Sequence, residues 1–340
     1  MASLWDDLET FANSPSSFSA NSAERGTIKP KANFNAEEDA AAIKKAIDGF
    51  GTNEKVLIDI LTQRSNAQRQ LICKAYEKAT GRTLEEDLKG DTDGHFEHLL
   101  VALITPPDVY DCHEVKRALK GPGTKNNILI EIFASRSNEQ IKALLKAYLQ
   151  ETKKELGPKL KSELSGDYSK ALLLLAQGNR DVSTAVNQQQ AKQDAETLFA
   201  AGEKQKWGTD EWKFIDILCT RSIAQLRQTL VEYKNLSGKT LQQSIEGEMS
   251  GHLEDLLVAV VKCVKSVPIY FAELLNESMK GGGTDESTLN RIMVSRSEID
   301  LLDIRAEFKK LYQRSLLSAL SSETTGDHRE CLKAICGGDD

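Results

Sequence analysis

Four short loops in this chain pair a threonine with an acidic residue 39 positions further along the sequence. The threonines, which follow a Gly-x-Gly pattern or its near relative, are Thr52, Thr124, Thr209 and Thr284. Their acidic partners are Asp91, Glu163, Glu248 and Glu323, and a glycine follows each partner three residues later. Calcium is coordinated by carbonyl and carboxylate oxygens alike. A glycine loop joined to a distant carboxylate therefore predicts a calcium site that duplication has repeated four times.

The donor groups of each site set its expected strength. Glycine tolerates unusual backbone dihedral angles, so a glycine loop can turn several carbonyl groups toward one point. A single carboxylate leaves the bound ion with net positive charge and with open positions for water or an anionic oxygen, such as that of a lipid phosphate. Each site should be weak alone and should tighten when an anionic ligand binds beside it.

The residue at the tip of each loop, two positions before the threonine, is Phe50, Pro122, Trp207 or Gly282. Trp207 stands next to Lys206, and such a pair is typical of a membrane–water interface. We therefore expect Phe50, Lys206 and Trp207 to contact a membrane. The alternative for Trp207 is a place in the protein core.

Helices must position these loops. Counted from the threonine, positions +5, +8 and +9 are apolar in all four copies, as in Leu57, Ile60 and Leu61, and this spacing predicts an amphipathic helix. The threonine is the expected N-cap of that helix. At +12 each copy has an arginine, which we expect to join helix ends by charge-assisted hydrogen bonds. A serine follows it, and in three copies a glutamine three residues later predicts a capping box.

The repeat covers most of the chain, and no sequence pattern typical of a β-strand occurs. It predicts an all-α fold of four repeats with about five helices each. The expected segments are a tail (1–33), repeats at 34–104, 105–176, 193–266 and 267–340, and a linker (177–192). In the tail, Leu4, Trp5, Leu8 and Phe11 fall on one helical face. A disordered tail is the alternative.

Composition excludes several classes of function. The net charge is −7, so electrostatic attraction draws the chain neither to nucleic acid nor to an anionic membrane. If the chain binds either of them, a multivalent cation must mediate the binding. The first residues lack the basic and apolar regions of a secretory signal, and the apolar runs are too short to span a bilayer. We expect a cytoplasmic protein, with export by a route without a signal peptide as an alternative. The six cysteines show no Cys-x-x-Cys pairing and are expected to be reduced.

Other metal and nucleotide sites fit the sequence less well. Residues 91–94 resemble part of an EF-hand, but Phe96 and Ala102 stand where that loop needs glycine and glutamate. The phosphate-binding pattern Gly-x-x-x-x-Gly-Lys-Ser/Thr is absent. The histidines at 95, 98 and 113 are more typical of scattered loop residues than of a zinc site. No nucleophile–base signature occurs, so we expect no enzymatic activity.

From about Thr27 to Asp340 the chain resembles the annexins, on the strength of the four loops, their +39 partners and the Arg-Ser pairs. The resemblance implies a curved, all-helical disc of four five-helix repeats with calcium loops on its convex face. It also implies reversible, calcium-dependent binding to acidic phospholipids such as phosphatidylserine, with Ca²⁺ as the cofactor. Self-assembly on the membrane would be consistent with it. By analogy with the family, the apolar face of the tail could dock on a small helical partner protein.

The resemblance also implies a ligand set for each ion, made of loop carbonyls and one carboxylate. These are Ile47, Gly49 and Gly51 with Asp91; Leu119, Gly121 and Gly123 with Glu163; Lys206 and Gly208 with Glu248; and Met279, Gly281 and Gly283 with Glu323. In the third repeat one extra residue within 202–206 leaves the remaining carbonyl open between Gly202 and Glu203.

Departures from the family pattern predict graded affinities. The first site has the shorter Asp91, and Asp48 stands where the family usually has lysine. The second has Pro122, which stiffens the loop, and Lys125, which adds positive charge near the ion. The fourth site has no such departure. We therefore expect the fourth site to be the strongest and the second the weakest.

Annexins also have a polar channel through the centre of the disc. The positions that match it here are Asp111, Glu114, Glu131, Arg136, Arg291 and Arg296. A cation-conducting channel is thus one alternative function, and a structural helical-repeat scaffold is another. The alternative for the polar cluster itself is a buried network of ion pairs that stabilises the fold.

Overall fold

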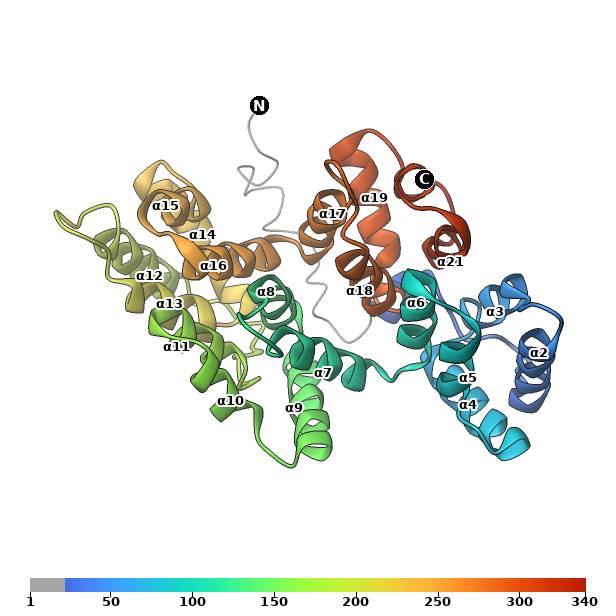
Figure 1. Ribbon diagram of the computed structural model, residues 1–340. Helices are drawn as coiled ribbons and strands as arrows, with labels where there is room; N and C mark the ends of the chain where they lie inside the picture. The colour runs from blue at the N-terminus through green and yellow to red at the C-terminus, as the bar shows by residue number, and fades with distance from the viewer. Residues whose placement is uncertain (1–21) are drawn as a thin grey trace. The chain divides into compact units, whose positions relative to one another are not determined.

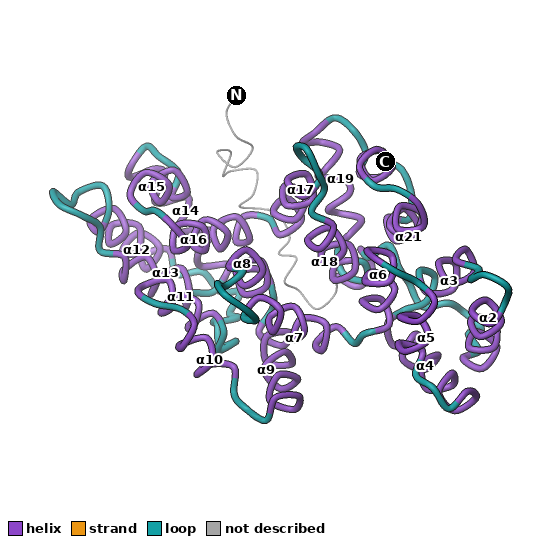
Figure 2. The backbone as a smooth tube through the Cα atoms, in the orientation of Figure 1, coloured by secondary structure: helices purple, strands orange, loops and turns teal. Residues whose placement is uncertain are grey.

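The computed structural model describes residues 22–340, and every regular element among them is a helix (Figures 1 and 2). The all-α prediction is confirmed. The described chain divides into two compact units. Unit 1 is Asp111–Tyr270, and unit 2 joins residues 22–110 to Phe271–Asp340. The tail residues Leu4, Trp5, Leu8 and Phe11 lie outside the described residues.

Each repeat contributes five α-helices, and two repeats make up each unit. Unit 2 begins with the short 3₁₀ helix η2 (Ser22–Arg25). Its helices are α2 (Ala36–Asp48), α3 (Glu54–Leu61), α4 (Asn66–Thr80), α5 (Leu84–Asp91), α6 (Gly94–Ile104), α18 (Glu286–Arg296), α19 (Leu301–Tyr312), α20 (Leu316–Glu323) and α21 (Gly326–Cys336). Helix α17 (Val267–Ser278) runs from one unit into the other.

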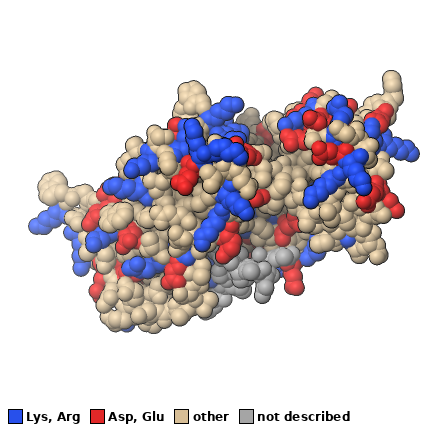
Figure 3. Space-filling model, turned by 90° about the horizontal axis from the view of Figure 1, so that it is seen from below, with Lys and Arg blue, Asp and Glu red and all other residues tan. Residues whose placement is uncertain are grey.

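Unit 1 contains the helices of repeats 2 and 3. Its helices are α7 (Pro107–Ala118), α8 (Asn126–Ser135), α9 (Asn138–Thr152), α10 (Leu156–Glu163), α11 (Gly166–Leu175), α12 (Gln188–Ala201), α13 (Glu211–Thr220), α14 (Ile223–Ser237), α15 (Leu241–Glu248) and α16 (Gly251–Lys265). No helix of residues 22–340 is both long and apolar enough to cross a bilayer. Figure 3 shows basic and acidic side chains interspersed over the face that it presents.

The predicted apolar stripe is buried in all four copies. The twelve residues at +5, +8 and +9 all belong to the core, and they include Leu57, Leu129, Phe214 and Leu289, none of which is exposed. The helix that carries this stripe starts one residue later than expected, because its N-cap is the residue after the threonine. Asn53 and Asp285 cap α3 and α18 with their side chains. The prediction of a threonine N-cap was wrong, and in three of the four repeats the threonine hydroxyl donates to a distant carbonyl instead.

The arginine at +12 forms a two-pronged ion pair in every repeat, as expected of a residue that joins helix ends. In repeats 1 to 3 its partner is an aspartate on the first helix of the same repeat, at hydrogen-bond distances of 2.7 to 3.3 Å. The pairs are Arg64–Asp39, Arg136–Asp111 and Arg221–Asp194. Planar guanidinium groups bind carboxylates in this geometry with defined orientation. The pair therefore fixes the first helix against the turn after the second.

Repeat 4 reaches the same result with different residues. The position that holds aspartate in the other repeats is Phe271, whose ring centre lies 4.7 Å from the Arg296 guanidinium carbon. Arg296 instead binds Asp300, with distances of 2.8 and 2.7 Å. Both side chains are almost wholly buried, at 4% and 0% exposure. Asp300 therefore supplies the countercharge, and it makes no side-chain cap of α19.

The predicted capping boxes are complete in two of three repeats. Ser65 with Gln68 and Ser137 with Gln140 form both hydrogen bonds of the box. In the third repeat, Ser222 caps α14, but the Gln225 side chain bonds the backbone of Asn187 in the linker, at 2.9 Å for both N–H and carbonyl. The glutamine that would close the box therefore holds the linker against repeat 3.

Candidate metal centre

The threonine hydroxyl joins the two halves of the site in three repeats. Thr284 Oγ1 donates to the Glu323 carbonyl oxygen at 2.9 Å, and Thr52 and Thr209 make the equivalent bonds at 3.2 and 3.3 Å. The partner is in each case the backbone of the residue at +39. This bond brings a carboxylate that is distant in sequence next to the glycine loop. Among the described residues, Thr124 makes no such bond to Glu163.

A backbone bond closes each loop at its base. The N–H after the threonine donates to a carbonyl at the end of the preceding helix, with Asn53 to Ala46 and Lys125 to Ala118 at 2.9 Å, and Asp285 to Ser278 at 2.7 Å. In repeat 3 the bond runs from Asp210 to Ala201 and encloses two more residues than in the other loops. The third loop is thus two residues longer than its three counterparts, and the prediction of one extra residue was wrong.

Almost all loop carbonyls that are expected to bind calcium accept no hydrogen bond from a protein group among the described residues. Within residues 22–340, no hydrogen bond is made to the carbonyls of Ile47, Gly49, Gly51, Leu119, Gly121, Gly123, Lys206, Gly208, Met279, Gly281 and Gly283. The one exception is the Gly202 carbonyl, which accepts from Gln205 N at 3.0 Å. Backbone acceptors without a protein donor need water or a cation. The donor set therefore fits a calcium ion.

Glycine is required in these loops for its conformation. Gly51, Gly208 and Gly281 have φ values of +79°, +74° and +103°, and residues other than glycine rarely adopt such values. The glycines at +42 share this property, at +58° to +69°. They start the last helix of each repeat, and a Cβ added to any of them would meet no atom within 4 Å. Backbone geometry, not lack of space, explains the +42 regularity.

The four acidic side chains differ in their surroundings. Glu163 accepts from Lys159 Nζ at 2.5 Å, and this bond raises the pKa of Lys159. Within residues 22–340, the carboxylate of Glu323 accepts only from the neighbouring Ser322 hydroxyl, at 3.0 Å. No group of three or more His, Cys, Asp or Glu side chains that could hold a metal occurs among the described residues. The carbonyl loops are therefore essential to the predicted sites.

Site 4 opens into a polar cavity of about 670 Å³ within unit 2. The cavity is lined by the Gly281–Thr284 loop, by Glu323 and by the start of α6. His328 lies at its buried side, 2.7 Å from the Asn290 side-chain oxygen, and burial lowers the pKa of His328 to about 4. The His95 ring lies near it, tilted by 44°, with ring centres 5.7 Å apart. These histidines pack with each other and with polar neighbours and form no metal cluster.

Replacing Thr284 with valine should weaken site 4, because valine keeps the shape of threonine but cannot donate to the Glu323 carbonyl. A net hydrogen bond is worth about 1 kcal/mol, so the calcium concentration for half-maximal vesicle binding should rise up to about fivefold. Thr124→Val is the matched control and should have little effect, because Thr124 lacks this bond. Equal effects of the two substitutions in calcium titrations would contradict the proposed role of the hydroxyl.

Replacing Lys159 with alanine should strengthen calcium binding at site 2, because Lys159 competes with the ion for Glu163. The pair is exposed, so the gain should be modest, about two- to threefold in affinity. Isothermal titration in a background with Asp91, Glu248 and Glu323 each changed to alanine would isolate this site. Lys161→Ala removes the same charge from the same helix without touching Glu163. If both lysine variants gain equally, general electrostatics and not the ion pair explains the change.

The loop tips are exposed where membrane contact was expected. Phe50 is fully exposed, and Trp207 is 92% exposed, so Trp207 does not belong to the core. Lys206 is exposed beside it. In contrast, Ile47, Leu119 and Met279 are buried and anchor their loops to the core by their side chains. Each loop thus keeps an apolar residue in the protein at its base.

Several residues of the expected central polar cluster have partners within their own unit. Arg136 binds Asp111, and Arg296 binds Asp300, as the equivalent arginines do in every repeat. Glu114 binds Arg117 at 2.7 Å. Arg291 donates to the Thr288 hydroxyl at 3.3 Å, and Glu131 is buried. Since the arginine–aspartate pair recurs in repeats 1 and 3, its presence in repeats 2 and 4 needs no conducting function.

Sequence reasoning missed several residues that shape the site. The aspartate partners of the +12 arginines went unidentified, although Asp39 and Asp111 stand at the same distance before their threonines. Glu203 was considered only as a source of a carbonyl. Its carboxylate is held by Lys239 and by the Ser244 hydroxyl, at 3.0 to 3.1 Å, and fixes the start of loop 3. No signal in a single repeat marks that role.

Known proteins share this repeat over most of the chain. A family model described as Annexin matches residues 38–103, 110–175, 193–260 and 270–335. Annexin A3 of Homo sapiens is 57% identical over 316 residues, which are 93% of this chain and 98% of that protein. Annexin A5 of Gallus gallus is 48% identical, with the same coverage of 93% and 98%.

Solved structures agree with the sequence relatives. A structure of annexin III superposes with a TM-score of 0.91 at 57% identity, covering 93% of this chain and 98% of that chain. A structure of calcium-bound annexin (Sm)1 superposes with a TM-score of 0.83 at 36% identity, covering 92% and 93% of the two chains. The chain belongs to the annexin family, a non-enzymatic family of four-repeat proteins that bind phospholipid in a calcium-dependent manner.

Proposed function

We propose that this chain attaches reversibly to membranes rich in acidic phospholipids through calcium held at its four glycine loops. The proposed ligands are the loop carbonyls together with Asp91, Glu163, Glu248 and Glu323. In loop 3 the third carbonyl is that of Gly202, which has a second acceptor position beside its bond to Gln205. When bound, calcium supplies the positive charge that the acidic chain lacks, and phosphate oxygens complete its coordination.

One observation carries the proposal. Apart from that of Gly202, the proposed loop carbonyls have no donor within residues 22–340, and three of the loops are bonded by a threonine to the backbone of an acidic residue. A site with so few charges is expected to be weak by itself. Because one chain carries four such loops, several weak contacts with the same membrane add up. The response to calcium should therefore be steep and reversible.

The exposed loop tips supply the apolar part of the contact. Phe50 and Trp207 would enter the interfacial region of the bilayer, where aromatic rings are favoured. Lys206 would keep its ammonium group among the headgroups while its stem packs beside the indole ring. Loops 1 and 3 would thus anchor the chain more firmly than loops 2 and 4, whose tips are Pro122 and Gly282.

The protein would be cytoplasmic at low calcium and peripheral on membranes when calcium rises. We also propose that the tail, through Leu4, Trp5, Leu8 and Phe11, binds a small helical partner protein. That interaction would be independent of the loops, so a chain lacking residues 1–21 should still bind vesicles. Loss of calcium-dependent binding on this truncation would count against the separation of the two activities.

Cosedimentation with vesicles tests the proposal. The full chain should pellet with phosphatidylserine vesicles in calcium, remain in the supernatant with phosphatidylcholine vesicles, and be released by chelator. Magnesium should not replace calcium, because it demands a more rigid octahedral shell and loses water reluctantly. Equal pelleting in calcium and in chelator would overturn the proposed function.

A further inference from the structure

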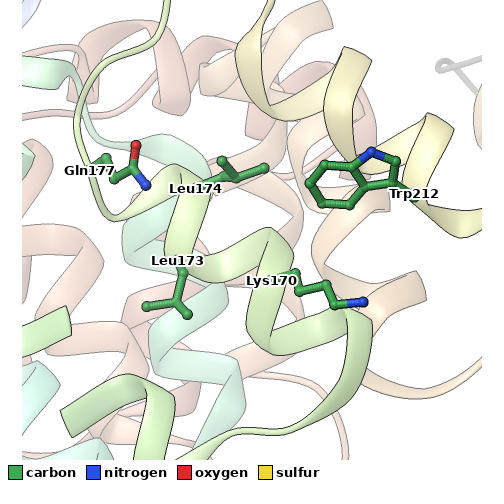
Figure 4. Close-up of a pocket in the computed structure, with 5 residues that line it drawn as sticks. All are labelled: Lys170, Leu173, Leu174, Gln177 and Trp212. Atoms are coloured by element: carbon green, nitrogen blue, oxygen red, sulfur yellow. The ribbon is translucent and has the colours of Figure 1, made fainter. Parts of the chain in front are cut away.

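An apolar groove lies between α11 and α13 in unit 1 (Figure 4). It has a volume of about 440 Å³ and is lined by Lys170, Leu173, Leu174, Gln177 and Trp212. Both leucines are half-buried, and the Trp212 side chain is 47% exposed. Ligand sites in proteins have volumes of roughly 300 to 1,000 Å³ and are mostly apolar with a few polar groups. The groove has the size and the lining of such a site.

The chain contains its own comparison for this groove. In unit 2 the equivalent helices, α21 and α3, also pack against each other. Counted from the threonines, the positions of Lys170, Leu173 and Trp212 are occupied there by Glu330, Lys333 and Lys55. Glu330 pairs with Lys333 at 3.7 Å, and the Lys55 side chain is 81% exposed. The repeat therefore folds with charged residues at these positions, and packing does not require the leucine and tryptophan.

Both helices of the groove start at predicted calcium loops. Helix α13 begins directly after loop 3, and Trp212 in its first turn is five residues from the exposed Trp207. Helix α11 begins at Gly166, three residues after Glu163. Thr209 bonds the Glu248 carbonyl at 3.3 Å and so fixes the start of α13 relative to site 3. The two helices that line the groove therefore both begin next to a predicted calcium site.

We propose that this groove receives the upper part of an acyl chain from a phospholipid whose headgroup is held at loop 3. The inference rests on the proposed function, since it needs loop 3 at the membrane. Leu173, Leu174 and the Trp212 ring would cover the methylene groups. Lys170, which is 60% exposed and pairs with Asp167 at 2.9 Å, stands at the rim where a lipid phosphate would lie. The polar groups at both ends restrict the occupant to a chain with a charged head.

Tryptophan fluorescence can detect this contact, because the chain has only three tryptophans. In a Trp5→Phe, Trp207→Phe protein, Trp212 is the sole emitter. Phosphatidylserine vesicles that contain phosphatidylcholine with brominated acyl chains should reduce its emission in calcium to less than about half, since a pocket ligand makes close contact with the lining. No reduction should occur in chelator. Protein that pellets with the vesicles while its Trp212 emission is unchanged would overturn the groove proposal alone.

A second variant separates an occupied groove from simple closeness to the bilayer. Leu173→Lys, made in the same background, introduces the residue found at the equivalent position of α21. It should pellet normally with calcium but lose the quenching of Trp212, because a lysine in the groove excludes an acyl chain. Quenching that persists in this variant would also overturn the inference. Failure of the unaltered chain, with Trp207 in place, to pellet with phosphatidylserine vesicles in calcium would instead refute the proposed function and the groove with it.

Discussion

Replacing Asp300 with alanine should destabilise the fold by about 3–5 kcal/mol, the largest effect of a single substitution that we expect in this chain. The reason is that Arg296 is left buried without its countercharge, against the ring of Phe271. A cation over an aromatic ring is attracted to it, but this attraction is weaker than a two-pronged ion pair. Urea-induced unfolding followed by circular dichroism measures the loss.

Repeat 3 supplies the matched control for this prediction. Asp194→Ala removes the equivalent carboxylate, but the Arg221 side chain is 33% exposed and can be solvated by water. Its loss should therefore cost clearly less, about 1–2 kcal/mol. If the two substitutions destabilise the protein equally, burial of the arginine does not set the strength of the pair.

Replacing Glu323 with alanine should raise the calcium concentration for half-maximal vesicle binding by about tenfold or more, since even groups behind the ligands of a metal typically contribute that much. Glu323 is expected to supply the only charged ligand of site 4. It is bonded to loop 4 through Thr284, and its carboxylate has no cationic partner among the described residues. Cosedimentation across a calcium series measures the change.

Two variants control for charge and for position. Glu163→Ala should have a smaller effect, because Glu163 is already paired with Lys159 and Thr124 does not join it to its loop. Glu330→Ala removes an acidic residue from α21 outside the loops and should leave the calcium response unchanged. A larger effect of Glu163→Ala than of Glu323→Ala would refute the ranking of the sites.

The helical fold could be predicted from the sequence because its signals are local. The apolar stripe at +5, +8 and +9 needs only one helix to be recognised, and all twelve residues are buried. The capping pairs were equally visible, except that Gln225 bonds the linker, which is a contact between distant residues. The role of the threonine was also predicted wrongly because its hydrogen bond joins distant residues. As an N-cap it would act locally, whereas its hydroxyl binds a carbonyl 39 residues away.

The candidate site was predictable as a pattern but not in its differences between repeats. In three repeats the spacing of 39 corresponds to a bond between the threonine hydroxyl and the backbone of the acidic residue, so there the regularity marks a real contact. Nothing in the spacing reveals that Lys159 binds Glu163 or that the Gly202 carbonyl already accepts a hydrogen bond. Such contacts depend on side-chain rotamers and on the closure of each loop, and both vary between repeats that share the same sequence pattern.

Vesicle binding of a variant without the four acidic residues tests the account most directly. In this protein Asp91, Glu163, Glu248 and Glu323 are each changed to alanine. The unaltered chain should pellet with phosphatidylserine vesicles in calcium. The variant should stay in the supernatant with and without calcium, while its circular dichroism spectrum remains that of a folded helical protein. A folded variant that pellets in calcium as the unaltered chain does would contradict the assignment of these carboxylates to calcium.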